Sequence, residues 1–214
     1  MSNIKGLPEH DIPVPQLLDI EQVSGGWIKK YLLKYKMPNG EPYSYESISR
    51  KSLEDYRAEL MRTGTTADAI CIVGVTPDRE LLMVKEFRYP VNDWVLAFPA
   101  GLLEPGEDLS IGVERELEEE TGYLLSDVPN NVIALDQPGY SSTGMSEESV
   151  HIVFARVEPG GTRHPEPMEF IEPFTLPLDD VDSFLEENQT AIGTRAQLIL
   201  ELFTKRTYFE GLGI

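Results

Sequence analysis

Acidic side chains are concentrated between Gly101 and Tyr123, in the stretch GLLEPGEDLSIGVERELEEETGY. On a helix, which turns by ~100° per residue, Glu116, Glu119 and Glu120 fall within one arc. Carboxylates gathered in this way repel one another unless a cation lies among them. Oxygen ligands of this kind suit Mg²⁺ or Mn²⁺ better than zinc, and Mg²⁺ is commonly shared with substrate phosphates. The spacing therefore indicates metal-dependent chemistry on a phosphorylated substrate, although a Glu-rich helix face is otherwise usually solvated surface.

The ends of this helix are also marked in the sequence. Asp108 is a suitable N-cap, and Gly122 stands where a left-handed residue would close the helix, which predicts a helix over 109–121. Arg115 precedes Glu119 by four residues, so it is placed to pair with this glutamate and orient it.

The remaining chain predicts a mixture of strands and helices without regular βαβ alternation, which favours an α+β fold. Residues 1–20 are expected to be an irregular leader, and Pro38-Asn39-Gly40 predicts the turn of a hairpin. We expect two regions: residues 1–62, with the leader and hairpin, and residues 63–214. Strands are predicted at 27–35, 43–50, 69–75, 81–87, 93–98, 132–136 and 149–157, and further helices at 52–62, 178–187 and 193–206.

Composition excludes several classes of protein. The chain has 37 acidic residues against 18 Lys and Arg, a net charge of −19, which argues against binding to nucleic acid or to an anionic membrane surface. A single cysteine excludes a disulfide framework and a cysteine-based zinc site. No secretion signal or long apolar run is visible, so a cytoplasmic protein is expected.

The complete spacing is more informative than the acidity. Gly101, Glu107, the Arg115-Glu116-Leu117 triplet, the Glu119-Glu120 pair and Gly122 follow one another at the intervals of the Nudix box. The chain therefore resembles the Nudix hydrolases, which cleave nucleoside diphosphates linked to another moiety with divalent metals. The resemblance implies an α/β/α sandwich around a mixed sheet, here with an N-terminal hairpin extension. It also implies roles for five residues: Glu116 and Glu120 as main metal ligands, Glu119 as a further ligand or supporting carboxylate, Glu107 as the outer glutamate, and Arg115 as their orienting arginine.

Segments outside the box are similar to the ADP-ribose pyrophosphatase branch, notably EFRYP at 86–90, AFPAG at 97–101 and PGY at 138–140. In that branch the carbonyl of the residue matching Ala100 binds a metal. A glutamate of a later loop binds metal or positions the attacking water, and Glu147 is the better match, with Glu148 as the alternative. Arg88 would contact the substrate phosphate or the terminal ribose.

The N-terminal region agrees with the same branch, in which it exchanges across a homodimer and supplies aromatic residues that sandwich adenine. The resemblance assigns Trp27 to this sandwich, with Tyr45 from the other subunit, and Arg50 to the same substrate site. The alternative is that both rings are ordinary strand aromatics packed on the core or on the dimer surface, and the adenine role is favoured more for Trp27 than for Tyr45.

The expected reaction is hydrolysis of ADP-ribose, and of related nucleoside diphosphate sugars, to AMP and a sugar phosphate such as ribose 5-phosphate, with Mg²⁺ or Mn²⁺ as cofactor. Alternatives are another Nudix substrate (another sugar nucleotide, NADH, FAD or a diadenosine polyphosphate) and a sensor that binds ADP-ribose without cleaving it. Sensors of this type usually lose box glutamates, and this chain has all of them.

Overall fold

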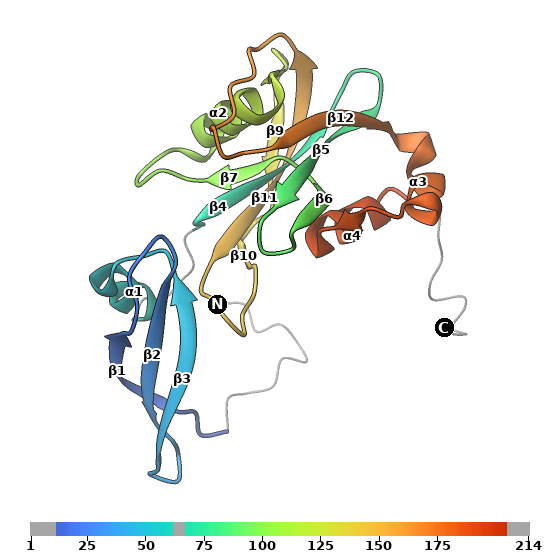
Figure 1. The fold of residues 1–214 in the computed structure, drawn as a ribbon. Coiled ribbons are helices and arrows are strands. Elements are labelled where there is room, and N and C mark those ends of the chain that lie inside the picture. The colour runs from blue at the N-terminus through green and yellow to red at the C-terminus, as the bar shows by residue number, and fades with distance from the viewer. Residues whose placement is uncertain (1–11, 62–66, 205–214) are drawn as a thin grey trace. The chain divides into compact units, whose positions relative to one another are not determined.

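The computed structural model describes residues 12–61 and 67–204, which form two compact units (Figure 1). The first unit comprises the described part of residues 1–65 together with 140–148, and the second comprises 66–139 and the described part of 149–214. The predicted boundary between residues 62 and 63 lies outside the described residues.

The first unit is a three-stranded antiparallel sheet with one helix. Its strands are β1 (Gln16–Gln22), β2 (Lys29–Lys36) and β3 (Pro42–Ser49), in the order β1-β2-β3, and α1 (Leu53–Leu60) follows. The prediction of an irregular leader up to residue 20 was wrong at β1. This strand has a weak alternation and a bulge between Leu17 and Asp19, and it is fixed by pairing with β2 rather than by its own pattern.

The predicted hairpin is confirmed, since β2 and β3 pair from Lys36–Pro42 at the turn to Lys29–Ser49. Gly40 has a φ of +89°, a backbone conformation that favours glycine, and its N–H donates to the Met37 carbonyl at 2.8 Å.

The second unit is built on a mixed sheet in the order β11-β4-β5-β6-β13. Strand β11 is parallel to β4, β13 is parallel to β6, and β5 is antiparallel to both β4 and β6. The strands of the second unit are β4 (Ala69–Val75), β5 (Glu80–Arg88), β6 (Asp93–Ala97), β7 (Ala100–Leu102), β8 (Tyr123–Leu125), β9 (Val132–Ala134), β11 (Ser149–Pro159), β12 (Ile171–Pro177) and β13 (Ala191–Ile192), and the short β10 (Gly139–Tyr140) leads into the segment 140–148.

Helices lie on both faces of this sheet, as the α/β/α expectation requires (Figure 1). Helix α2 (Leu109–Thr121) packs on Ile70 and Ile72, whereas α3 (Val181–Glu187) and α4 (Thr194–Glu201) share the core cluster that contains Cys71 and Val73. Successive side chains of a strand point to opposite faces, so β4 is buried on both sides and its sequence is an unbroken apolar run. The α+β expectation is confirmed. In the described part of the chain, no helix is both long and apolar enough to span a membrane.

Strand β12 was not predicted, because Pro173 and Pro177 suggested only a broken connection before the last helices. Pro173 instead stands opposite Val84 in a regular antiparallel pairing of β12 with β5. A proline is tolerated in a strand whose N–H groups on one edge have no ladder partner. The last predicted helix is shorter than expected, since α4 ends at Glu201, and residues 205–206 lie outside the described range.

Candidate active site

Helix α2 has the predicted limits and caps. The Asp108 carboxylate accepts a hydrogen bond from the N–H of Ser110 at 2.9 Å, and Gly122 closes the helix with a φ of +73°. The helix therefore presents its glutamates at the spacing that the sequence indicates.

The two inward carboxylates of α2 belong to Glu116 and Glu120, which are 9% and 6% exposed. Glu120 Oε2 accepts a hydrogen bond from the N–H of Ala100 at 3.1 Å, so strand β7 lies directly against this carboxylate. Burial raises the pKa of Glu116, and it raises the pKa of Glu120 further, with the negative charge of Glu116 as the second cause. Both side chains are therefore costly to keep ionised without an added cation.

Two glycines make room for this arrangement. A Cβ on Gly101 would lie 1.9 Å from the carboxyl carbon of Glu116, so a side chain there would displace the carboxylate. A Cβ on Gly112 would lie 2.5 Å from Cδ2 of Leu103, which explains glycine at a box position where small residues are common.

Arg115 orients several of the box carboxylates at once. Its Nε and Nη2 donate to the two oxygens of Glu107, each at 3.0 Å, and Nη1 donates to Glu116 Oε1 at 2.7 Å. The predicted contact with Glu119 is present but longer, at 3.4 Å, and Nη2 also donates to the Leu102 carbonyl at 2.9 Å. This guanidinium lowers the pKa of Glu107, so the outer glutamate stays ionised and bound to Arg115.

The donor set fits a hard divalent cation. Among the described residues, no three His, Cys, Asp or Glu side chains converge into a closed metal cage. Mg²⁺ requires no such cage, because one or two carboxylates, water and substrate phosphates complete its octahedron. The buried pair Glu116 and Glu120 could supply those carboxylates, and no ion pair to Glu120 occurs in the part of the chain that the structure describes.

Two further glutamates of the second unit were not singled out from the sequence. Burial raises the pKa of Glu86 on β5, and the nearby charge of Arg88 opposes this shift, with Arg88 Nη2 at 2.6 Å from Glu86 Oε2. The charge of Glu169, just before β12, raises the pKa of Glu86, and also those of Glu116 and Glu120. Glu86 stands beside Arg88 in the EFRYP segment, whereas the sequence around Glu169 carries no comparable signal.

The C-terminal end of α2 is held by the segment 160–164, which was also not predicted. Arg163 Nε donates to the Glu120 carbonyl at 2.8 Å, and the N–H of His164 donates to the Glu119 carbonyl at 3.0 Å. The last carbonyls of a helix have no partner within it, so these donors satisfy them and place a positive charge at the negative end of the helix dipole.

The two loop glutamates lie in the first unit. Glu147 Oε1 accepts a hydrogen bond from Ser49 Oγ and lies 3.5 Å from Lys51 Nζ, whereas its buried Oε2 has no hydrogen-bond partner. Glu148 forms a close ion pair with Arg50. Glu147 therefore has a buried oxygen without a hydrogen-bond partner, whereas Glu148 is engaged by Arg50.

The predicted aromatic pair also lies in the first unit. Trp27 precedes β2 and is 72% exposed, so it does not pack in the core of this chain. Tyr45 lies on β3, and its hydroxyl donates to the Gly144 carbonyl at 2.7 Å. The assignment of both rings to adenine stays a prediction.

A model of the NUDIX domain matches residues 65–197, so the chain belongs to the Nudix hydrolases, a family that generally uses divalent metal ions. It is a hydrolase of pyrophosphate bonds, similar to the ADP-ribose pyrophosphatases. It is 31% identical to the ADP-ribose pyrophosphatase of Saccharomyces cerevisiae, over 83% of this chain and 76% of the relative. It is 29% identical to the ADP-sugar pyrophosphatase of Mus musculus, over 89% of this chain and 82% of the relative.

A bacterial relative is 28% identical, the ADP-ribose pyrophosphatase of Bacillus subtilis, with 87% of this chain and 88% of the relative aligned. The crystal structure of an ADP compounds hydrolase superposes with a TM-score of 0.70 and 23% identity, over 96% of this chain and 99% of the other. The fold is therefore the Nudix fold, with a three-stranded N-terminal sheet in addition.

Proposed function

We propose that the protein hydrolyses ADP-ribose to AMP and ribose 5-phosphate with Mg²⁺ or Mn²⁺. The observation that carries this proposal is the buried pair Glu116 and Glu120 on the Nudix helix, two carboxylates with raised pKa values and one arginine contact between them. A divalent cation would compensate these charges and those of a diphosphate. The names of the yeast and Bacillus relatives support ADP-ribose as the substrate, and the name of the mouse relative supports a wider range of ADP-sugar substrates.

The metal would be held by Glu116, Glu120 and the Ala100 carbonyl, with Glu107, Glu119 and Glu147 as further carboxylates of the set. When bound, it would neutralise the diphosphate and lower the pKa of an attacking water. Arg115 holds Glu107, Glu116 and Glu119 in fixed orientations, so these carboxylates would need little rearrangement to bind a metal ion.

Glu147 would orient and deprotonate the water. Ser49 and Lys51 hold its Oε1, which leaves Oε2 as the acceptor. The water oxygen forms a new bond to phosphorus, its proton passes to Glu147, and the bridging P–O bond breaks to release AMP and ribose 5-phosphate. Glu148 is the alternative base, but its ion pair with Arg50 would first have to open.

Substrate binding is assigned to Trp27, Tyr45, Arg50 and Arg88, with Tyr45 supplied by the second subunit of a homodimer. Support comes from the exposed ring of Trp27, since stacking an adenine on an aromatic ring contributes about 1–3 kcal/mol. Arg88 and Arg50 are each paired with a glutamate, so a phosphate group would replace or share these partners. We place the protein in the cytoplasm, in line with its single free cysteine.

A turnover screen tests this proposal. ADP-ribose, ADP-glucose, GDP-mannose, NADH and FAD would be incubated with Mg²⁺, and the products separated by chromatography. ADP-ribose should be cleaved fastest, with AMP and ribose 5-phosphate as products and no turnover after chelation of the metal. Faster cleavage of another substrate would refute the choice of ADP-ribose, and binding of ADP-ribose without any cleavage would indicate a sensor.

A further inference from the structure

The second unit contains a cavity of about 860 Å³ outside the Nudix box, where strand β4 ends. Its wall is formed by the turn between β4 and β5, by the C-terminal half of β11 and by the loop between β8 and β9. Helix α2 contributes no residue to this wall, so the cavity is separate from the buried pair Glu116 and Glu120. Its volume lies within the range of cavities that bind small molecules.

The floor of this cavity is apolar, as the register of the strands shows. Phe154 and Arg156 are two residues apart on β11, so they point to the same face of the sheet. Ile133 stands opposite Phe154 on β9, and Val75 stands opposite Arg156 on β4. Phe154 and Val75 pack against the core of this face, whereas Ile133 is 64% exposed. A flat or apolar group can therefore cover this floor.

Two arginines of the wall have no carboxylate partner. In residues 12–61 and 67–204, neither Arg79 nor Arg156 forms an ion pair, although Glu158 also lines the cavity. The guanidinium of Arg57, by contrast, is engaged by Asp19 at 2.9 Å. In a protein of net charge −19, two unpaired guanidiniums on one cavity form a local positive site. Guanidiniums match the oxygens of a phosphate group, so this site favours a phosphorylated ligand.

The backbone of Arg79 indicates that its side chain is present for binding and not for the turn. Its φ is +63°, a left-handed conformation that glycine adopts without strain and a residue with a Cβ does not. The Arg79 N–H donates to the Thr76 carbonyl, and the Arg79 carbonyl accepts from the N–H of Leu178, both at 3.0 Å. These bonds hold the strained conformation from two sides. Strain of this kind is concentrated at functional positions.

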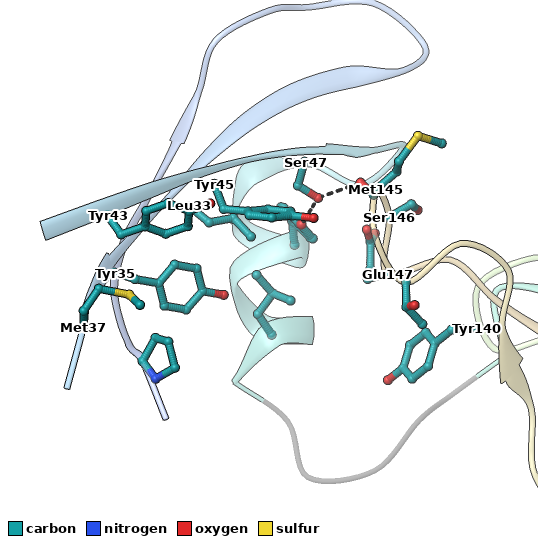
Figure 2. A pocket seen from close by; sticks show the side chains of 14 residues that line it. Leu33, Tyr35, Met37, Tyr43, Tyr45, Ser47, Tyr140, Met145, Ser146 and Glu147 are labelled. Carbon is teal, nitrogen blue, oxygen red and sulfur yellow. Dashed lines mark hydrogen bonds between the residues drawn. The ribbon is translucent and has the colours of Figure 1, made fainter. Parts of the chain in front are cut away.

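The cavity of the first unit has the opposite charge. It measures about 530 Å³ and lies between β2, β3, α1 and the segment 140–147 (Figure 2). Among the described residues that line it, Glu147 is the one charged side chain, and no lysine or arginine takes part. An anionic ligand would therefore select the cavity of the second unit.

We propose that the cavity of the second unit binds a nucleoside monophosphate without a metal ion. The phosphate is held by Arg79 and Arg156, and the base covers the floor formed by Phe154 and Ile133. The sugar hydroxyls donate to the Glu158 carboxylate, which can only accept. The carboxylates of α2 need a cation before they can hold an anion, whereas this cavity already carries more positive than negative charge. The proposal does not depend on the substrate that the Nudix site hydrolyses.

Titration of the protein in the presence of EDTA tests this proposal, with AMP, inorganic phosphate and adenosine as probes. Binding is followed by NMR through the backbone amides of Asn131 and Arg156, which lie in the cavity wall, and of Glu120 in the box helix. We expect AMP to shift the two cavity amides and to bind at least about fivefold more tightly than inorganic phosphate, because the phosphate alone leaves the floor uncovered. Adenosine should bind at least about tenfold more weakly than AMP, because it lacks the charged group.

Two variants remove one guanidinium each: Arg156→Gln and Arg79→Gly. Glycine adopts the left-handed conformation at position 79, so Arg79→Gly should keep the fold, and its Tm should not fall. Each variant should weaken AMP binding by about tenfold, the effect of losing one charge-assisted contact. Lys36→Gln is the control, because Lys36 is exposed on β2, lines neither cavity and carries the same charge. Its affinity for AMP should change by less than about twofold.

The outcomes that would overturn the proposal are distinct. Absence of AMP binding to the unmodified protein, shifts confined to α2, or unchanged affinity in both arginine variants would refute a site in this cavity. An equal loss in Lys36→Gln would reduce the effect to overall charge, and equal affinities for AMP and inorganic phosphate would refute the places of base and sugar. Failure of the proposed hydrolysis would leave these results unaffected, because neither metal nor turnover enters the titration.

Discussion

Replacing Glu120 by glutamine should strongly reduce turnover and, at the same time, stabilise the metal-free protein. Glu120 is 6% exposed, and its Oε2 accepts a hydrogen bond from the N–H of Ala100. Glutamine has nearly the same shape and retains an oxygen for this hydrogen bond, so packing is preserved. What disappears is a buried negative charge that lies one helical turn from Glu116.

The size of the stabilisation follows from these contacts. Repulsion between like charges four residues apart on a helix costs about 0.2–0.5 kcal/mol at the surface. Glu120 is buried as well, and an uncompensated buried charge costs more, so we expect a gain of about 1–3 kcal/mol in the free energy of unfolding. For a chain of this length, each kcal/mol raises Tm by about 2–4 °C. Turnover should fall by about 100-fold or more, because a proposed metal ligand is lost.

Thermal unfolding with and without Mg²⁺, together with turnover of ADP-ribose, measures both effects. Glu114→Gln is the matched control, because Glu114 is exposed on the same helix and the change in formal charge is identical. The control should leave both Tm and turnover nearly unchanged. A lower Tm for Glu120→Gln in the absence of metal would refute our account of the buried charge, and retained turnover would refute the site assignment.

Three further predictions concern the pH dependence of stability, the end of helix α2 and the loop glutamates. Glu116 and Glu120 have pKa values raised above the ordinary 4.5, so the native state binds more protons than the unfolded state. The metal-free protein should therefore lose stability as pH rises from about 4.5 through the raised values. Denaturant titrations at several pH values should show a weaker dependence of stability on pH for Glu120→Gln. Arg163→Met removes the donor to the Glu120 carbonyl and should weaken Mg²⁺ binding about threefold to tenfold, as measured by calorimetry. Arg163→Lys should recover part of this loss. An unchanged affinity for the metal would contradict a positioning role for Arg163. Glu147→Gln should lower kcat by about 100-fold with little change in KM. Glu148→Gln should mainly raise KM, because Arg50 loses the partner that holds it in position for the substrate. Steady-state kinetics that gave the reverse order would assign the base to Glu148.

The part of the fold that was predictable is the part determined by local sequence. Helix α2 begins after an N-cap aspartate and ends at a left-handed glycine, so both limits could be predicted to the residue. Strand β4 could be predicted because it is buried on both faces and is apolar throughout. In these elements the signal is local and strong.

Strands β1 and β12 were missed because tertiary pairing determines them. Most side chains of β1 are exposed, with Ile20 as its one buried residue, so its pattern indicates no strand. Strand β12 contains proline, which is compatible with a strand only in a particular pairing environment. The same reason applies to Arg163, whose contact with the Glu120 carbonyl spans 43 residues of sequence and leaves no local pattern.

The charge balance explains why this acidic protein requires a cation to act on an acidic substrate. Arg115 is shared among Glu107, Glu116 and Glu119, and its strongest geometry is the two-point contact with Glu107. Its single positive charge cannot neutralise three carboxylates, and the Glu120 carboxylate is bound instead by the backbone N–H of Ala100. The uncompensated negative charge is therefore concentrated at the buried pair Glu116 and Glu120. Two added positive charges at this place would stabilise the helix and attract a diphosphate, so stability and substrate binding should depend on the same metal.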